Sequence, residues 1–174
     1  MTASHGCDAV LFDRDGTLIV DVPYNGDPRR VLPVPGARRA LDLLRDRGIA
    51  IGVVTNQSGV ARGVLTLEQV RAVNQRVEQL LGPFDTWQVC PHGTDDGCPC
   101  RKPEPGLVLA ASSSLGVPTH RMTLIGDIGS DVSAGLAANA RAILVPTPKT
   151  RREEVDAAPE VSPDLLAAVE KVLR

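Results

Sequence analysis

Short runs of apolar and β-branched residues alternate along the chain with segments whose apolar residues recur at helical spacing. The runs lie at residues 9–12, 49–55, 85–90, 122–126 and 142–146. Strands that alternate with helices form right-handed βαβ units, and such units build a parallel sheet. Because the runs are apolar almost throughout, we expect helices to cover both faces of the sheet. The sequence therefore predicts an α/β fold of three layers with a central parallel sheet.

The helical segments carry start signals in addition to their spacing. They are expected to begin after Pro35-Gly36, at Thr66, near Pro105, at Ser130 and at Ser162. At Thr66 the residue three positions on is Gln69, which completes a capping box. At Ser162 the following residue is Pro163, whose missing N–H costs little at the first helical position. The segment before that helix, 146–163, is predicted to be a mobile surface loop.

Length and composition limit the classes of protein that this chain can join. With 174 residues it is long enough for a core of its own, and we expect a single domain over residues 1–174. Aromatic residues make up 2% and the net charge is −2, whereas nucleic-acid binders show a basic surplus and stacking aromatics. No apolar run approaches the roughly 20 residues that cross a bilayer, and residues 1–10 do not resemble a secretion signal. We expect a cytoplasmic monomer with no nucleic-acid or membrane partner.

Two carboxylates, Asp13 and Asp15, stand two positions apart directly after the first strand, in the stretch FDRDGT. Three interpretations compete for them: an ordinary turn, a calcium loop and a catalytic pair. A calcium loop needs glycine at its sixth position and glutamate at its twelfth. Here glycine is fourth and the twelfth position holds Tyr24, which excludes the calcium loop. The turn and the catalytic pair both remain open from this stretch alone.

Three distant segments bear on the choice, because each ends a strand or opens a helix with polar residues. Thr55 ends the second strand, Lys102 stands just before a helix, and Asp127 and Asp131 follow the fourth strand. Taken singly, each has an ordinary explanation: a turn former, a solvated charge, or an acid favoured by the helix dipole. In parallel α/β sheets, however, the binding crevice lies beyond the carboxyl ends of the strands. We therefore expect these side chains to converge there with the first pair of carboxylates.

The order of these motifs resembles that of the haloacid dehalogenase (HAD) superfamily of phosphotransferases. The resemblance spans residues 10–146, and its motifs are Asp13-x-Asp15-Gly16-Thr17, Thr55, Lys102 and Gly126-Asp127-x-x-x-Asp131. It implies a Rossmann-like HAD fold and an enzyme that hydrolyses phosphate monoesters. The gaps 16–54 and 56–101 are too short to hold a cap domain beside their own helix and strand. We therefore expect an uncapped pocket.

The resemblance also implies a role for each of these residues. Asp13 would attack phosphorus and carry an aspartyl-phosphate. Asp15 would protonate the departing alkoxide and then act as base on the water that hydrolyses the intermediate. Thr55 and Lys102 would hold and neutralise the phosphoryl oxygens as charge redistributes.

A catalytic metal fits the same set of residues. Acids that lie close together repel one another, and a divalent cation removes that penalty. Mg²⁺ prefers oxygen ligands, so we expect Asp13, Asp127 and the backbone carbonyl of Asp15 to hold it. Asp131 is expected to orient these groups instead of binding the metal.

A second set of potential metal ligands crowds into the loop 90–100. It consists of Cys90, His92, Cys98 and Cys100. Four soft or borderline ligands are the number that tetrahedral structural zinc needs, with no position left for substrate. Disulfides are rare in a reducing compartment, so the cluster indicates metal before bridges. A cysteine-rich loop with a free histidine is the alternative, and Cys7 is assigned no role.

The zinc loop, placed just before CRKP, narrows the resemblance to the subgroup of heptose-bisphosphate phosphatases and histidinol phosphatases. The segments DRDGT, TNQSGVARG and CRKPEPG are closest to the heptose enzymes. The match to that family suggests the following substrate-binding residues: Asp21, Tyr24, Asn56, Gln57, Ser58 and Arg101. One position departs from the family pattern, because Ile128 stands where a lysine or arginine is common.

Three functions follow from this sequence as hypotheses. The first is a Mg²⁺-dependent phosphatase that acts on a small phosphorylated sugar, most plainly heptose 1,7-bisphosphate at its 7-phosphate. The second is histidinol-phosphate phosphatase, which is the same chemistry on an amino-alcohol ester. The third is a non-catalytic interaction module stabilised by zinc. The intact set of Asp13, Asp15, Lys102 and Asp127 favours an enzyme over the third hypothesis.

Overall fold

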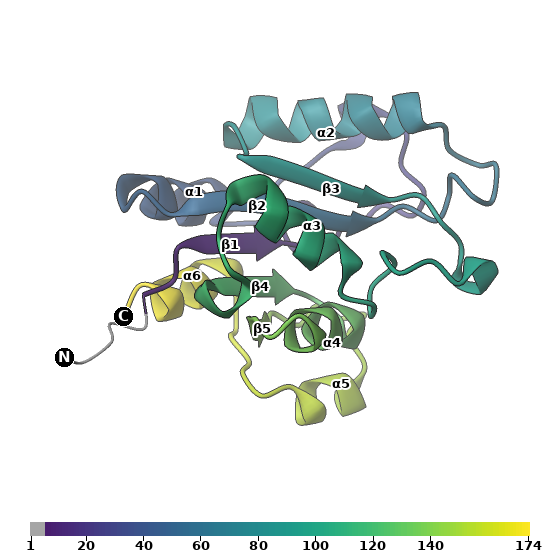
Figure 1. Cartoon of the computed structure of the whole chain (residues 1–174). Helices are drawn as coiled ribbons and strands as arrows, with labels where there is room; N and C mark the ends of the chain where they lie inside the picture. Colours follow the sequence, from purple (N-terminus) through teal and green to yellow (C-terminus); the bar gives the residue numbers. More distant parts are fainter. Residues whose placement is uncertain (1–5) are drawn as a thin grey trace.

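The sheet of this protein is parallel, with all of its strands running the same way (Figure 1). The computed structural model describes residues 6–174. Within that range five strands pair in the order β3-β2-β1-β4-β5. Their bounds are Ala9–Phe12 (β1), Ala50–Asn56 (β2), Thr86–Cys90 (β3), Met122–Gly126 (β4) and Arg141–Leu144 (β5). The predicted central parallel sheet is confirmed.

Helices cover both faces of the sheet and complete the three layers. They are α1 (Ala37–Asp46), α2 (Leu67–Leu81), α3 (Gly106–Leu115), α4 (Gly129–Ala137), α5 (Arg152–Ala157) and α6 (Leu165–Val172). On one face, α1, α2 and α6 pack with Val10 and Phe12 of β1 into the larger apolar cluster. On the other, α3 and α4 pack against Ala9 and Leu11. Successive β1 side chains thus pack on opposite faces of the sheet. Because both faces are covered, the strand is apolar throughout.

The start of α2 follows the predicted capping box. The Thr66 hydroxyl accepts a hydrogen bond from the Gln69 N–H at 3.1 Å, and the Gln69 side chain accepts one from the Thr66 N–H at 2.9 Å. The two side chains therefore satisfy two backbone N–H groups that the first turn leaves without partners. The third and fourth helices begin at Gly106 and Gly129, each within one residue of the prediction.

The predicted start of the last helix is wrong. The N-cap of α6 is Asp164, whose carboxylate accepts a hydrogen bond from the Ala167 N–H at 2.8 Å. Ser162 lies instead in extended chain beside β5, where its N–H donates to the Leu144 carbonyl at 2.9 Å. The Ser162 hydroxyl is buried without a hydrogen-bond partner and caps nothing, whereas the Asp164 carboxylate accepts from the first turn of the helix.

The segment 146–163 is also more regular than a surface loop. It contains α5, and the Glu154 carboxylate on that helix accepts a hydrogen bond from the Gly129 N–H at 3.1 Å. The helix is short and none of its residues is buried, so it has no apolar stripe that the sequence could reveal. No helix within residues 6–174 combines the length and apolar character that a membrane span requires.

The order of the strands brings the polar residues together. β1 lies between β2 and β4, and the Asp13 N–H continues the ladder by donating to the Ile125 carbonyl at 3.0 Å. The residues that follow these three strands therefore meet at one edge of the sheet. The loop that carries Lys102 reaches the same edge just before α3.

We predict that Gly106→Ala destabilises the protein, because α3 begins in close contact with the preceding loop. A Cβ atom at Gly106 would overlap the Pro99 carbonyl oxygen and lie 2.7 Å from the Cys100 Cα atom. Backbone cannot move aside cheaply, so we expect a loss of about 1–3 kcal/mol in the free energy of unfolding, measured by chemical denaturation. Helix propensity alone predicts the opposite, namely that alanine stabilises the helix relative to glycine. The matched control is Gly93→Ala, where the nearest atom lies at 3.5 Å, and equal stability of the two variants would contradict the prediction.

Candidate functional site

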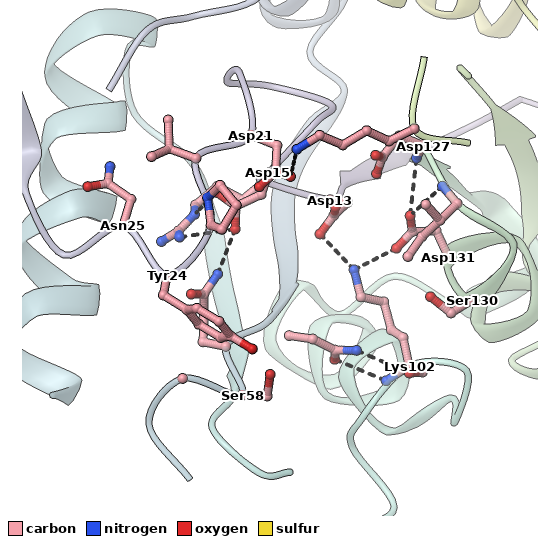
Figure 2. Close-up of a pocket in the computed structure, with 18 residues that line it drawn as sticks. Asp13, Asp15, Asp21, Tyr24, Asn25, Ser58, Lys102, Asp127, Ser130 and Asp131 are labelled. Atoms are coloured by element: carbon pink, nitrogen blue, oxygen red, sulfur yellow. Dashed lines mark hydrogen bonds and ion pairs between the residues drawn. The ribbon is translucent and has the colours of Figure 1, made fainter. Parts of the chain in front are cut away.

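A cavity of about 370 Å³ opens at the carboxyl ends of the strands (Figure 2). Its walls come from the loops that follow β1, β2 and β4, from the loop before α3, and from the turn that carries Lys149. The polar residues at its floor include Asp13, Lys102, Asp127 and Asp131, which are the residues expected to converge.

Lys102 is the centre of this floor. Its ammonium group donates hydrogen bonds to Asp13 Oδ1 at 2.7 Å, to Asp131 Oδ1 at 2.6 Å and to the Val54 carbonyl at 2.8 Å. Burial on its own lowers the pKa of a lysine, but the two carboxylates outweigh that effect and raise the pKa of Lys102 above its ordinary value. Lys102 is therefore a permanent positive charge beside Asp13.

Asp131 uses its oxygens to hold other residues. While Oδ1 accepts from Lys102, Oδ2 accepts from the backbone N–H groups of Asp127 and Ile128 at 3.1 and 3.2 Å. These contacts fix the start of α4 and the direction of the Asp127 backbone. They suit the expected orienting role of Asp131 better than a role as metal ligand.

Asp13 and Asp127 have the character of metal ligands. Each places a carboxylate oxygen within 4.8 Å of the other and of Asp131. Burial raises the pKa of Asp13 well above its ordinary value. The Lys102 ammonium group lowers this pKa, and the neighbouring carboxylates raise it further. Burial and the Asp131 carboxylate raise the pKa of Asp127 to about 7. Crowded acids that resist ionisation are relieved by a bound cation, so this donor set fits Mg²⁺.

Gly16 makes room for this pair of carboxylates. Its backbone is left-handed, with φ +84°, and a Cβ atom there would overlap Asp127 Oδ2 and lie 2.9 Å from Asp127 Cγ. Only glycine adopts this conformation easily and leaves that space open. The glycine of the DxDGT motif thus admits Asp127 to the site.

Asp15 is held at the edge of the pocket by a residue that the sequence did not single out. The Arg14 guanidinium donates to both Asp15 oxygens, at 3.2 and 3.1 Å, and to the Asn74 side chain at 2.6 Å. Arg14 is 1% exposed. An arginine between two acids is expected in a surface turn, and its partner Asn74 lies 60 residues away on α2. No local signal indicates that contact.

Two residues expected to bind substrate also hold other members of the site. The Asn56 side chain both donates to and accepts from the Lys102 backbone, at 3.1 and 3.0 Å. The Gln57 amide donates to Asp15 Oδ2 and to the Thr55 hydroxyl, each at 2.8 Å. Both residues also line the pocket.

The remaining substrate candidates divide between two places. Asp21, Tyr24 and Ser58 line the pocket (Figure 2). Arg101 does not: it lies in a neighbouring hollow with the cysteine-rich loop, and its guanidinium donates to the His92 carbonyl at 3.4 Å. Lys149 lines the pocket without having been expected there, because its segment was predicted to be a loop.

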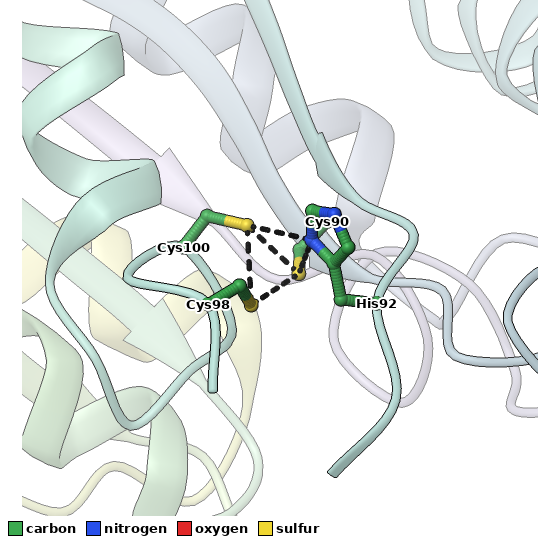
Figure 3. A group of neighbouring side chains, drawn as sticks. All are labelled: Cys90, His92, Cys98 and Cys100. Atoms are coloured by element: carbon green, nitrogen blue, oxygen red, sulfur yellow. Dashed lines mark hydrogen bonds between the residues drawn. The ribbon is translucent and has the colours of Figure 1, made fainter. Parts of the chain in front are cut away.

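The four residues of the cysteine-rich loop face one another (Figure 3). The Cys100 sulfur lies 3.0 Å from that of Cys90 and 3.5 Å from that of Cys98, and His92 Nδ1 lies 3.3 Å from the Cys100 sulfur. No disulfide joins these cysteines, all of which belong to the described range. Burial, together with the Cys90 and Cys98 thiols, raises the pKa of Cys100 to about 12. Thiols packed this closely ionise together only around a cation, so the cluster fits a structural metal.

Comparison with known proteins gives results consistent with this geometry. The family model described as HAD-hydrolase-like matches residues 99–170. A D-glycero-β-D-manno-heptose-1,7-bisphosphate 7-phosphatase of Pseudomonas putida is 34% identical over 94% of this chain and 98% of its own length. The enzyme of the same name from Yersinia pestis is 34% identical over 95% of each chain. A crystal structure of a D,D-heptose 1,7-bisphosphate phosphatase from B. bronchiseptica, complexed with magnesium and phosphate, superposes with a TM-score of 0.86 at 30% identity and covers 95% of this chain and 98% of that one.

The fold and the site therefore define a phosphatase of the HAD superfamily, a hydrolase of phosphate monoesters. Within it, the chain belongs to the family of D-glycero-β-D-manno-heptose-1,7-bisphosphate 7-phosphatases.

Proposed function

We propose that this protein removes the 7-phosphate of D-glycero-D-manno-heptose 1,7-bisphosphate and leaves the monophosphate and inorganic phosphate. The observation that carries the proposal is the Asp13 carboxylate bound to the buried Lys102 ammonium at the floor of an open polar pocket. A carboxylate held against a fixed cation is placed to attack phosphorus, while the cation stabilises the charge on the phosphoryl oxygens. The relatives named for this substrate match nearly the whole chain.

In the first step an Asp13 oxygen forms a bond to phosphorus as the bond between phosphorus and the sugar oxygen breaks. Asp15 gives its proton to the departing sugar oxygen. In the second step Asp15 takes a proton from a water molecule, whose oxygen bonds to phosphorus as Asp13 is released. The Arg14 guanidinium donates to both Asp15 oxygens and so holds this carboxyl group at the edge of the pocket for both steps.

Mg²⁺, when bound by Asp13 and Asp127, supplies positive charge to the phosphoryl group and allows both carboxylates to ionise. The chain itself supplies the rest of the arrangement. Asn56 fixes the backbone of Lys102, and Gln57 holds Thr55 beside Asp15. Asp131 fixes Lys102 and the Asp127 backbone. Because these contacts exist before substrate enters, little reorganisation remains for the reaction.

The test of this function is release of inorganic phosphate in the presence of Mg²⁺, compared between heptose 1,7-bisphosphate and histidinol phosphate. We expect kcat/KM to be higher for the heptose ester and to vanish when EDTA removes the metal. Asp13→Asn removes the attacking oxyanion but keeps the shape, so activity should fall at least about a thousandfold while the fold persists. Faster turnover of histidinol phosphate would reject the substrate, and an active Asp13→Asn protein would reject the nucleophile.

We further propose that Cys90, His92, Cys98 and Cys100 bind a structural zinc ion. All four ligand atoms lie within 4.8 Å of one another, and they leave no ligand position for substrate. Cys90 ends β3, whereas Cys98 and Cys100 stand just before Arg101 and Lys102. A metal held there ties the loop that positions Lys102 to the sheet.

We predict that Cys98→Ser lowers both the zinc content and the thermal stability. Loss of one thiolate ligand should cost at least about 2 kcal/mol, or roughly 4–8 °C in Tm for a chain of this size. Zinc is measured by mass spectrometry and Tm by calorimetry. The matched control is Cys7→Ser, since Cys7 lies outside the cluster beside Thr123. Wild-type protein that carries no zinc after preparation without chelators would reject the assignment.

A further inference from the structure

Lys149 reaches across the mouth of the pocket and meets the loop that follows β1. Its ammonium group lies 2.9 Å from Asp21 Oδ2, and both residues line the pocket. The pair joins the turn after β5 to the loop that carries Asp21 and Tyr24. Asp21 lies 128 residues before Lys149 along the chain. It bridges two of the walls between which a substrate must enter.

Lys149 differs from the other cations that line the pocket. Arg14 is buried and bound to Asp15, and Lys102 is buried and bound to the floor acids Asp13 and Asp131. The Lys149 side chain is 65% exposed. Position 128, beside Asp127, contributes no charge because it is isoleucine. Among the described residues that line this pocket, Lys149 is thus the cation that faces solvent and remains able to meet a ligand.

The backbone below Lys149 is firmly built. The Thr150 hydroxyl donates to the Asp127 carbonyl at 2.6 Å and accepts from the Thr147 N–H at 2.8 Å. The Thr147 hydroxyl in turn accepts from the Lys149 N–H at 3.2 Å. The turn 147–150 is therefore attached to the backbone of a floor residue. Lys149 starts from a fixed point, and only its flexible side chain has to move.

The ion pair with Asp21 is one that a ligand can displace. Both partners are partly exposed, with 65% and 35% of their side chains accessible, and such surface pairs contribute little to stability. A phosphate dianion offers a lysine more charge than one carboxylate does, so exchange of partners is favourable. Asp21 also raises the pKa of Lys149, which keeps the ammonium protonated before the ligand arrives.

We propose that Lys149 binds the second, non-reacting phosphate group of a sugar bisphosphate and so determines the preference of this enzyme for bisphosphates. Asp21 holds Lys149 in place in the free enzyme, and on exchange its carboxylate becomes free to accept a hydrogen bond from a sugar hydroxyl. This inference rests on the proposed function. It adds the residue that distinguishes a bisphosphate from a simple phosphate ester.

The test compares two substrates in wild type and in Lys149→Met, which keeps most of the side-chain length and removes the charge. For heptose 1,7-bisphosphate we expect KM to rise about 10- to 100-fold with little change in kcat, as for loss of one charge-assisted hydrogen bond. The rise in KM should be at least about ten times smaller for p-nitrophenyl phosphate, which has no second phosphate. Lys149→Arg should restore most of the preference. Lys171→Met is the matched control, because Lys171 lies on α6 and donates to the Val161 carbonyl.

A change of equal size for both substrates, or no change for either, overturns the inference. A third measurement separates it from the proposed function: inhibition of p-nitrophenyl phosphate turnover by heptose 1,7-bisphosphate. If wild type does not hydrolyse the bisphosphate but is inhibited by it, and Lys149→Met weakens that inhibition, the proposed function fails and the role of Lys149 stands. If the bisphosphate neither reacts nor inhibits wild type, both proposals fall.

Discussion

The ammonium group of Lys102 is buried where the ends of the central strands meet, and the site is arranged around it. A buried charge is tolerated only when it is paired and hydrogen-bonded. Lys102 meets this condition through Asp13, Asp131 and the Val54 carbonyl. Because these partners follow β1, begin α4 and belong to β2, the ion network also fixes three elements relative to one another. If Asp13 lost its charge, Asp131 and the Val54 carbonyl would still pair the ammonium group, whereas loss of both carboxylates would leave a buried charge without compensation.

The same network creates the conditions for phosphoryl transfer. The carboxylates of Asp13 and Asp127 are crowded enough that their pKa values are raised, and a cation relieves that repulsion. Asp13 meanwhile has one oxygen bound to Lys102 and stands at the floor of a pocket that is open to a ligand. A dianionic phosphate entering this pocket would meet fixed positive charge beside the carboxylate that we propose as the nucleophile. Electrostatic arrangements that exist before the substrate binds provide much of the catalysis in many enzymes.

Sequence patterns were sufficient for the fold and for the floor of the pocket, but not for its walls. The apolar runs located all five strands because a strand covered on both faces is apolar throughout. The topology of parallel sheets then brings Asp13, Thr55 and Asp127 to one edge. The Arg14–Asn74 contact and the position of Lys149 could not be predicted, since each joins segments far apart in the sequence without a local signal. The helix α5 escaped prediction because none of its residues is buried. The last helix begins later than predicted because Asp164 caps it, whereas the Ser162 hydroxyl makes no hydrogen bond.

The central claim is that Asp13 carries the phosphoryl group while Lys102 stabilises it. Its most direct test is a crystal structure of the protein with Mg²⁺ and beryllium trifluoride, which forms a stable mimic of an aspartyl-phosphate. The account predicts beryllium bonded to an Asp13 oxygen, with a fluorine atom within hydrogen-bonding distance of the Lys102 ammonium group. A mimic bonded to a different carboxylate, or a Lys102 side chain turned away from a mimic on Asp13, would contradict it.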